Sequence, residues 1–276
     1  MKARTDDVKD IMAKLETGIS EMFASDRYAD WVRAMSRFHN YSLNNTMLIL
    51  MQRPDATRVA GYKTWESLKR HVKKGEHGIK ILAPCPHKKV VKDDAGNEEV
   101  VVWTTYRAVS VFDISQTDGD PLPTIYNGLL SGGVDGYNEM IDRLINIAPV
   151  PVDFEDDVRD GAAGYYSKAE GRIVVKSGMS EMQTVKTLCH EIAHSIMHSG
   201  DCKKDRATKE VEAESVAFAL CNHYGIDTSD YSLSYVAGWS VGKDIKILRA
   251  SMDDIRKATS DLIGKIDAAE PLRVAA

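Results

Sequence analysis

The residues with the clearest chemical potential form one short motif, His190-Glu191-Ile192-Ala193-His194, inside a segment with helical periodicity. Positions i and i+4 lie on one face of a helix, about one turn apart, so the two imidazoles can converge on one metal ion. Glu191 follows the first histidine and can take a proton from a water molecule that such a metal activates. The motif therefore predicts His190 and His194 as metal ligands and Glu191 as a general base.

Such a site needs a third protein ligand, and the sequence offers several candidates. His198 continues the histidine stripe, but on a straight helix it lies about 12 Å from His190, too far to share one ion with both histidines. The next predicted helix carries three acidic candidates, Glu210, Glu212 and Glu214. Glu210 and Glu214 share a face, so Glu214 could accept the other ring N–H of a ligand histidine if Glu210 is the ligand. The spacing leaves the choice among the three open.

The elements that must position these residues predict an α+β protein of two domains. Helical patterns cover residues 6–38, 43–51, 64–73, 137–147, 180–198, 208–224 and 240–266. Strands are expected at residues 79–83 and 106–112, and hairpins around residues 94–97 and 169–171. A Gly- and Pro-containing segment from Asp118 onward predicts a domain boundary near residue 127. We therefore expect a first domain over residues 1–127 and a mostly helical second domain with a small sheet over residues 128–276.

The charge is unevenly distributed along the chain. The whole protein has a net charge of -5 and 43% hydrophobic residues, which excludes a disordered chain or a histone-like polycation. Between Arg53 and Lys89, however, ten basic residues face three acidic ones. Basic side chains neutralise phosphates and exposed aromatic rings stack on unpaired bases, although a basic surface over core aromatics is the simpler alternative. The candidate nucleic-acid contacts are Tyr41, Arg53, Arg58, Lys63, Trp65, Lys73, Lys74 and Lys80.

Features of export and membrane insertion are lacking in the sequence. The four cysteines form no C-x-x-C pair, and the first residues are charged rather than apolar. No apolar run approaches the roughly 20 residues that span a bilayer. We expect a cytoplasmic protein with reduced thiols and no membrane partner.

Several segments resemble the ArdC-type antirestriction proteins of conjugative plasmids and other mobile elements. In the first domain the similar segments are Tyr41-Ser-Leu-Asn-Asn, Gln52-Arg-Pro-Asp-Ala-Thr, Gly61-Tyr-Lys-Thr-Trp, Lys74-Gly-Glu-His-Gly-Ile-Lys-Ile-Leu-Ala-Pro and Val111-Phe-Asp-Ile-Ser-Gln-Thr. In the second domain they are Leu188-Cys-His-Glu-Ile-Ala-His and Glu210-x-x-Ala213-Glu214. The second set is also similar to gluzincin-type and ImmA/IrrE-type metallopeptidases.

This resemblance implies a first domain that binds single-stranded DNA and a second domain with a zincin-like peptidase site. It implies Glu210 as the third ligand of one divalent metal, Zn²⁺ first, with Mn²⁺ or Co²⁺ as alternatives. An unknown protein substrate would be cleaved, and incoming DNA would be protected from host restriction. If the site is gluzincin-like, the strand Arg172–Lys176 is expected at the edge of the cleft, where it would hold an extended peptide by β-addition.

Three other functions stay open at this point. The protein could be a non-enzymatic DNA-binding shield whose metal only braces the fold. It could be a regulatory protease that cleaves a repressor, or a protease that acts on DNA–protein crosslinks.

Overall fold

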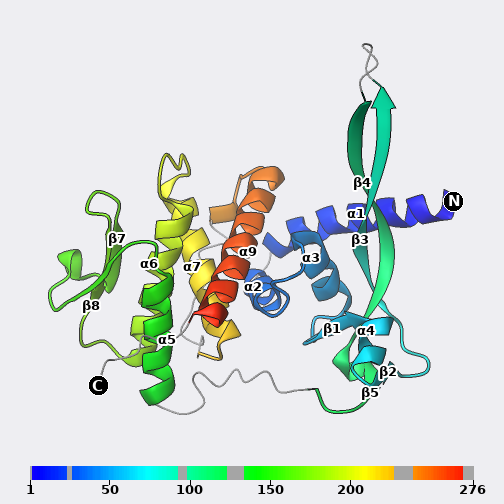
Figure 1. Cartoon of the computed structure of the whole chain (residues 1–276). Coiled ribbons are helices and arrows are strands. Elements are labelled where there is room, and N and C mark those ends of the chain that lie inside the picture. Colours follow the sequence, from blue (N-terminus) through cyan, green and yellow to red (C-terminus); the bar gives the residue numbers. More distant parts are fainter. Residues whose placement is uncertain (1, 24–26, 93–97, 123–133, 227–238, 270–276) are drawn as a thin grey trace. The chain divides into compact units, whose positions relative to one another are not determined.

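The computed structural model describes residues 2–23, 27–92, 98–122, 134–226 and 239–269, and it confirms the α+β class (Figure 1). The chain divides into two compact units. The first unit comprises Met1–Glu21 and Asn44–Leu122, and the second comprises Met22–Leu43 and Pro123–Ala276. The boundary expected at residue 127 lies outside the described residues, and residues 22–43 group with the second unit.

The first unit combines a long β-hairpin with three helices and three short strands. Its helices are α1 (Lys2–Phe23, to Glu21 in this unit), α3 (Leu43–Gln52) and α4 (Tyr62–Ser67). Its strands are β1 (Val59–Gly61), β2 (Arg70–Val72), β3 (Ile79–Lys92), β4 (Glu98–Asp113) and β5 (Thr117–Gly119), with a 3-10 turn at Ile114–Gln116. The antiparallel order β1-β4-β3 forms one sheet, and β2 pairs with β5 in another.

The helix predicted over residues 64–73 is wrong in its second half. Helix α4 ends at Ser67, and Lys69 has a positive φ of 56°, which a right-handed helix does not allow. The next residues form β2, and the Arg70 guanidinium donates hydrogen bonds to Thr117 O (2.9 Å) and Gly119 O (3.2 Å) of β5. Tertiary pairing with a distant strand therefore overrides the local helical pattern.

The strands predicted separately at 79–83 and 106–112 belong to one continuous hairpin, paired from Ile79↔Val111 to Lys92↔Glu98. Its base is anchored by two side-chain amides of α3. Asn45 donates to Leu82 O and accepts from Leu82 N, both at 2.9 Å, and Gln52 makes the same pair of bonds with Lys80 at 2.9 Å. These amides take the place of a neighbouring strand along the open edge of β3.

The second unit packs helices against a small three-stranded sheet. Its helices are α2 (Tyr28–Arg37), α5 (Val134–Ile147), α6 (Glu181–Met197), α7 (Arg206–His223) and α9 (Ile245–Ala268). Its strands are β6 (Val152–Glu155), β7 (Gly164–Ser167) and β8 (Arg172–Lys176), with a 3-10 turn at Arg159–Gly161. The single helix predicted over residues 6–38 is therefore two helices, α1 and α2, which lie on either side of the undescribed residues 24–26.

The core of the second unit lies between α6, α7 and α9. Fully buried side chains from these helices include Leu188, Ile192, Val216, Leu220, Met252 and Ile255. Helix α2 packs on α7, where the hydroxyls of Tyr28 and Ser215 lie 3.0 Å apart. Within the described part of the chain, every helix is too short or too polar to cross a membrane.

Asp113 joins three segments of the first unit. Its carboxylate accepts hydrogen bonds from the backbone N–H groups of Thr57 (2.8 Å), Arg58 (3.0 Å) and Ser115 (3.0 Å). Its backbone N–H donates to the Gln116 side chain at 2.9 Å, which completes a capping box. Burial by itself raises the pKa of Asp113, but the hydrogen bonds outweigh it and hold the pKa below its usual value.

We predict that Asp113→Asn lowers the free energy of unfolding of the first unit by about 1–3 kcal/mol, because one amide oxygen cannot replace the carboxylate. The amides of Thr57 and Arg58 should exchange faster with deuterium. Since the pKa of Asp113 is lowered, its contribution is present above about pH 4 and is lost as the pH falls through the folded-state pKa. Asp55→Asn, at an exposed carboxylate, is the control. Equal protection of both amides in Asp113→Asn would contradict this role.

Candidate metal centre

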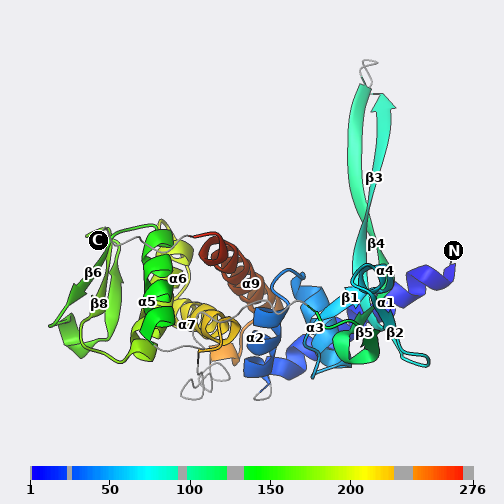
Figure 2. The same cartoon turned by 60° about the horizontal axis from the view of Figure 1, so that its bottom comes forward.

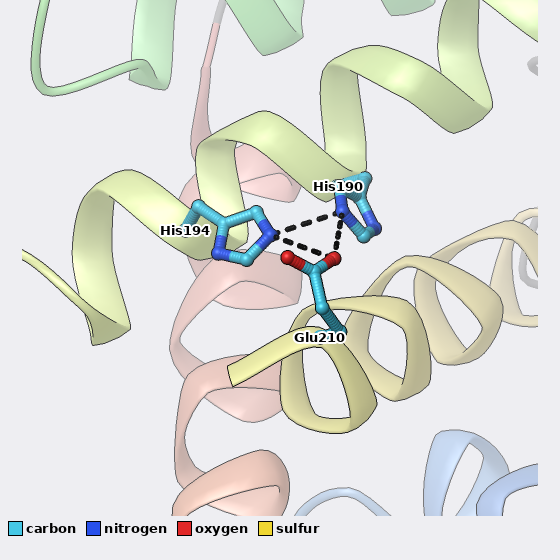
Figure 3. Close-up of side chains that lie close together, drawn as sticks. All are labelled: His190, His194 and Glu210. Atoms are coloured by element: carbon cyan, nitrogen blue, oxygen red, sulfur yellow. Dashed lines mark hydrogen bonds and ion pairs between the residues drawn. The ribbon is translucent and has the colours of Figure 1, made fainter. Parts of the chain in front are cut away.

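Two helices bring three potential ligand atoms together. Helix α6 is capped by Ser180, whose Oγ accepts from Gln183 N at 3.3 Å, and its regular turns place His190 and His194 on one face. Helix α7 is capped by Asp205, which accepts from Thr208 N at 2.7 Å. Figure 3 shows Glu210, from the start of α7, pointing at both imidazoles of α6.

The distances within this cluster suit a tetrahedral metal ion. The Nε2 atoms of His190 and His194 lie 3.0 Å apart, and Glu210 Oε2 lies 3.5 Å and 3.6 Å from them. Ligands about 2.0–2.1 Å from a tetrahedral ion are separated by roughly 3.3–3.4 Å. Two facing imidazole nitrogens also need a proton or a cation between their lone pairs. The residues present therefore fit a divalent metal.

The electrostatics of the cluster favour a cation. Burial lowers the pKa of His190, but the neighbouring carboxylates of Glu210 and Glu214 outweigh it and raise the pKa to about 10. The contacts with His190 and His194 lower the pKa of Glu210 below its usual range. The negative charge that stabilises an imidazolium in this way would stabilise a divalent metal at the same point.

Glu214 lies one turn beyond Glu210, beside the other nitrogen of His190. Its Oε2 is 2.9 Å from His190 Nδ1, although the N–H direction does not meet hydrogen-bond geometry. An imidazole that binds a metal through Nε2 carries its proton on Nδ1, and a carboxylate there orients the ring. Glu214 is thus positioned to accept from His190 after a small rotation of the ring.

Glu191 lines a cavity of about 280 Å³ beside the ligand cluster. Burial raises the pKa of Glu191, the direction that a general base near neutral pH needs. The cavity is lined by Ala163, Gly164, Gln183, Lys186, Thr187, His190, Glu191 and Glu214. One histidine of the cluster and the candidate base therefore border the same space.

The edge of this cavity is formed by β7 rather than by the expected strand β8. The sheet order is β6-β8-β7, so β8 (Arg172–Lys176) pairs with a strand on each side and has no free edge for a peptide. Strand β7 lies between β8 and the cavity. A Cβ at Gly164 would come within 2.7 Å of Thr187 Cγ2, so β7 approaches α6 too closely for a larger residue. The expectation that β8 forms the edge is wrong.

A buried polar chain extends from the cluster into the core, and the sequence reasoning did not find it. His194 Nδ1 lies 2.9 Å from His198 Nδ1, and His198 Nε2 lies 3.0 Å from Glu212 Oε2. Glu212 is fully buried and also accepts from Lys204 Nζ (2.7 and 2.9 Å) and from Ser251 of α9. If His194 binds a metal through Nε2, its Nδ1–H donates to His198, whose Nε2–H then donates to Glu212.

Part of this hydrogen-bonded series of side chains could have been predicted from the sequence. His198 continues the four-residue spacing of the histidines, and it lies outside the ligand cluster, as the helix length indicates. Glu212, considered from spacing as a third ligand, faces His198 instead of the cluster. Its partners Lys204 and Ser251 come from a loop and from another helix, so spacing along α7 could not reveal them.

The candidate nucleic-acid contacts differ in exposure and in the unit to which they belong. Trp65 is 2% exposed and its indole N–H donates to Phe112 O at 3.0 Å, so it offers no ring face to a base. Tyr41 is half-buried and belongs to the second unit. Arg53 and Lys73 donate to Ser115 at 3.0 and 3.1 Å. The candidates with exposed side chains are Arg58, Lys63, Lys74 and Lys80.

Fold and site together define a two-domain protein with a His/His/Glu cluster that fits a divalent metal and lies beside a cavity. Residues 2–112 match the family described as the N-terminal domain of anti-restriction factor ArdC. Residues 152–224 match a peptidase family described as the IrrE N-terminal-like domain. The second match includes all three residues of the cluster.

Two solved structures share the fold of the chain, and one curated protein resembles its sequence over most of its length. Two crystal structures of the antirestriction ArdC protein from the R388 plasmid share the fold at 17% sequence identity. Each alignment covers 97% of the solved chain. The metal-free form has a TM-score of 0.56 over 92% of this chain, and the Mn(II)-bound form 0.54 over 91%. An uncharacterized Bacillus anthracis protein, pXO2-81, is 28% identical over 304 aligned positions, which cover 95% of this chain and 51% of the relative. The chain thus spans about half the length of that curated relative. It matches the ArdC N-terminal domain and the IrrE-like domain, and it shares the fold of the R388 ArdC structures.

We predict that His198→Gln weakens metal binding by about 10–100-fold without changing the number of sites, because His194 loses the acceptor that orients it. Competition with a fluorescent chelator measures the affinity. The matched control is His77→Gln, at an exposed histidine of the first unit. Equal metal affinities for His198→Gln and the wild-type protein would show that the hydrogen bonds from His194 through His198 to Glu212 do not contribute to metal binding.

Proposed function

We propose that the protein is an antirestriction factor of a mobile element that binds single-stranded DNA and carries a metal-dependent peptidase site. The observation that carries the peptidase part is the cluster of His190, His194 and Glu210, of which His190 lines the same cavity as Glu191. The match of residues 2–112 to the ArdC N-terminal domain supports the DNA-binding part. The proposed place of action is the cytoplasm of a new host, where incoming DNA meets restriction enzymes.

In this proposal His190, His194 and Glu210 are the ligands of one divalent metal. When bound, the metal would lower the pKa of a water molecule and polarise a peptide carbonyl. Glu191, whose pKa burial raises, takes the proton of the attacking water and passes it to the leaving amine. His198 orients the His194 imidazole from its Nδ1 side, and Glu214 does the same for His190 after a small rotation of that ring.

Zinc is the proposed native metal, because two imidazoles and one carboxylate are its usual ligands in peptidase sites. The same donors accept Mn²⁺ or Co²⁺, so availability contributes to the choice. The Mn(II)-bound form of the R388 ArdC protein supports a divalent metal in this fold.

The proposed substrate is an extended segment of an unidentified protein that lies along β7. This strand is the described edge of the sheet nearest the cavity, and Ala163 and Gly164 line that cavity. Exposed strand edges bind extended peptides through backbone hydrogen bonds. The adjacent Glu191 accepts the Tyr166 backbone N–H, which fixes the candidate base relative to this edge.

We predict that His190→Ala and Glu210→Ala each abolish stoichiometric metal binding, because two protein ligands hold a metal far less tightly than three. Metal analysis of the purified proteins measures this. Anisotropy titration with labelled single-stranded DNA should give wild-type affinity for both variants, since the cluster lies in the second unit. Full metal content in Glu210→Ala would show that the ligand set is wrong.

We predict that Glu191→Gln keeps the metal but lowers any proteolytic turnover by about 10²–10⁴-fold, because the general base is lost. The measurement is survival of unmodified DNA after transfer into a restricting host, with proteomic comparison of cleaved host proteins. Glu181→Gln, at an exposed residue of the same helix, is the control. If Glu191→Gln protects DNA fully and the set of cleaved proteins is unchanged, the protein acts as a DNA-binding shield. If protection is intact but the cleavage of a repressor is lost, the regulatory protease is favoured.

A further inference from the structure

We infer that the outer part of the β3–β4 hairpin, residues 84–90 and 99–107, is an arm that binds single-stranded DNA. This inference rests on the proposed DNA binding and names the surface responsible. Figure 2 shows the hairpin extending away from the helices and short strands of its own unit. Among the described residues of the arm, side chains on both faces of the ribbon are exposed to solvent.

Apolar and aromatic side chains occupy both faces of the arm. Residues directly opposite each other in an antiparallel pair share a face. One face carries the opposed pairs Val90↔Val100, Lys88↔Val102 and Pro84↔Tyr106, and the other carries Lys89↔Val101, His87↔Trp103 and Ala83↔Arg107. Trp103 is 43% exposed, Tyr106 57% and Val102 57%.

The outer hairpin is not stabilised by a hydrophobic core of its own. A two-stranded hairpin without a core is marginally stable in water, and contiguous exposed apolar side chains mark surfaces that bind a partner. The α3 amides that anchor the base act only at Lys80 and Leu82. Beyond them, the described side chains of the arm are exposed apart from the half-buried Cys85, so we assign its apolar surface to a partner.

The charge of the arm indicates which partner. Lys88, Lys89 and Arg107 are exposed, and none of them forms an ion pair with another residue that the structure describes. The acidic side chain described on the arm is Glu99. Alternating cations and flat apolar groups match a chain of phosphates and bases, whereas an apolar protein surface does not need the cations.

The aromatic side chains favour a single strand over a duplex. Trp103 stacks on His87 with ring centroids 5.3 Å apart and an interplanar angle of 17°, which leaves its other ring face available. His87 Nε2 lies 2.7 Å from Thr105 Oγ1, which fixes the imidazole of this stack. Tyr106 lies on the opposite face of the ribbon. A flexible strand can pass around the ribbon and stack unpaired bases on both rings, which a duplex cannot do.

Tryptophan fluorescence tests the arm directly. Of the four tryptophans, Trp31, Trp65 and Trp239 are at most 8% exposed, so Trp103 is the one that a base can reach. We expect an oligo(dT) to quench the emission of the full-length protein, and the quenching to disappear in Trp103→Phe. The affinity of Trp103→Ala should fall about tenfold by anisotropy. Circular dichroism should show that both variants keep the wild-type fold.

Salt dependence tests the charges separately. Neutralising Lys88, Lys89 and Arg107 together to Gln should reduce the slope of log affinity against log salt by about 2, since each phosphate contact contributes about 0.7. Glu99→Gln should tighten binding. Lys14→Gln, at an exposed residue of α1 in the same unit, should change neither quantity.

The outcomes separate this inference from the proposed function. If the wild-type protein does not bind oligo(dT), the proposed DNA binding fails. If it binds, but Trp103 is not quenched and the triple variant keeps its slope, the arm is not the binding surface. The inference would also be overturned if duplex DNA competed as strongly as oligo(dT). It would equally be overturned if Trp103→Ala lost self-association while its DNA binding stayed unchanged.

Discussion

The packing of α7 against α6 is the contact on which the candidate site depends. The histidines of α6 converge because of helix geometry alone, but the third ligand atom reaches them only if α7 lies at the right height and rotation. Caps at Ser180 and Asp205 set where the two helices begin, and the apolar core with α9 sets how they pack. An error of one turn in α7 would move Glu210 by about 5 Å and exchange the ligand for another residue.

The buried charge of Glu212 adds a second constraint to the same packing. An isolated carboxylate in a core is strongly unfavourable, and this one is compensated by His198, Lys204 and Ser251 together. These partners come from the end of α6, from the loop that follows it, and from α9. Satisfying one charge therefore fixes three segments around the helix that supplies Glu210. Because burying the Glu212 carboxylate costs desolvation energy, we interpret its role as specifying how α6, α7 and α9 pack rather than as adding stability.

In the first unit, the segments that resemble ArdC-type proteins hold the fold together more than they form a surface. Asn45 and Gln52 replace a strand along β3, and Asp113 with Gln116 ties the turn after β4 to residues 57–58. Trp65, which the sequence suggested as a stacking residue, fills the core. The exposed aromatic side chains described in this unit lie instead on the long hairpin, at Trp103 and Tyr106, and at the start of α4, at Tyr62. Segments that resemble a family can therefore contain residues that support the fold, and not only residues that form its exposed surface.

By itself, the sequence determined the α+β class, the order of the principal elements and the pair of histidines with its neighbouring glutamate. These follow from periodicities of two and 3.6 residues and from spacing within one helix, which are local properties. The tertiary structure alone decided that Glu210 faces both imidazoles, that β7 rather than β8 borders the cavity, and that Arg70–Val72 is a strand. It also brought Lys204 and Ser251 to Glu212. Each of these depends on a partner distant in sequence, and a contact of that kind leaves no periodic pattern in the segment that makes it.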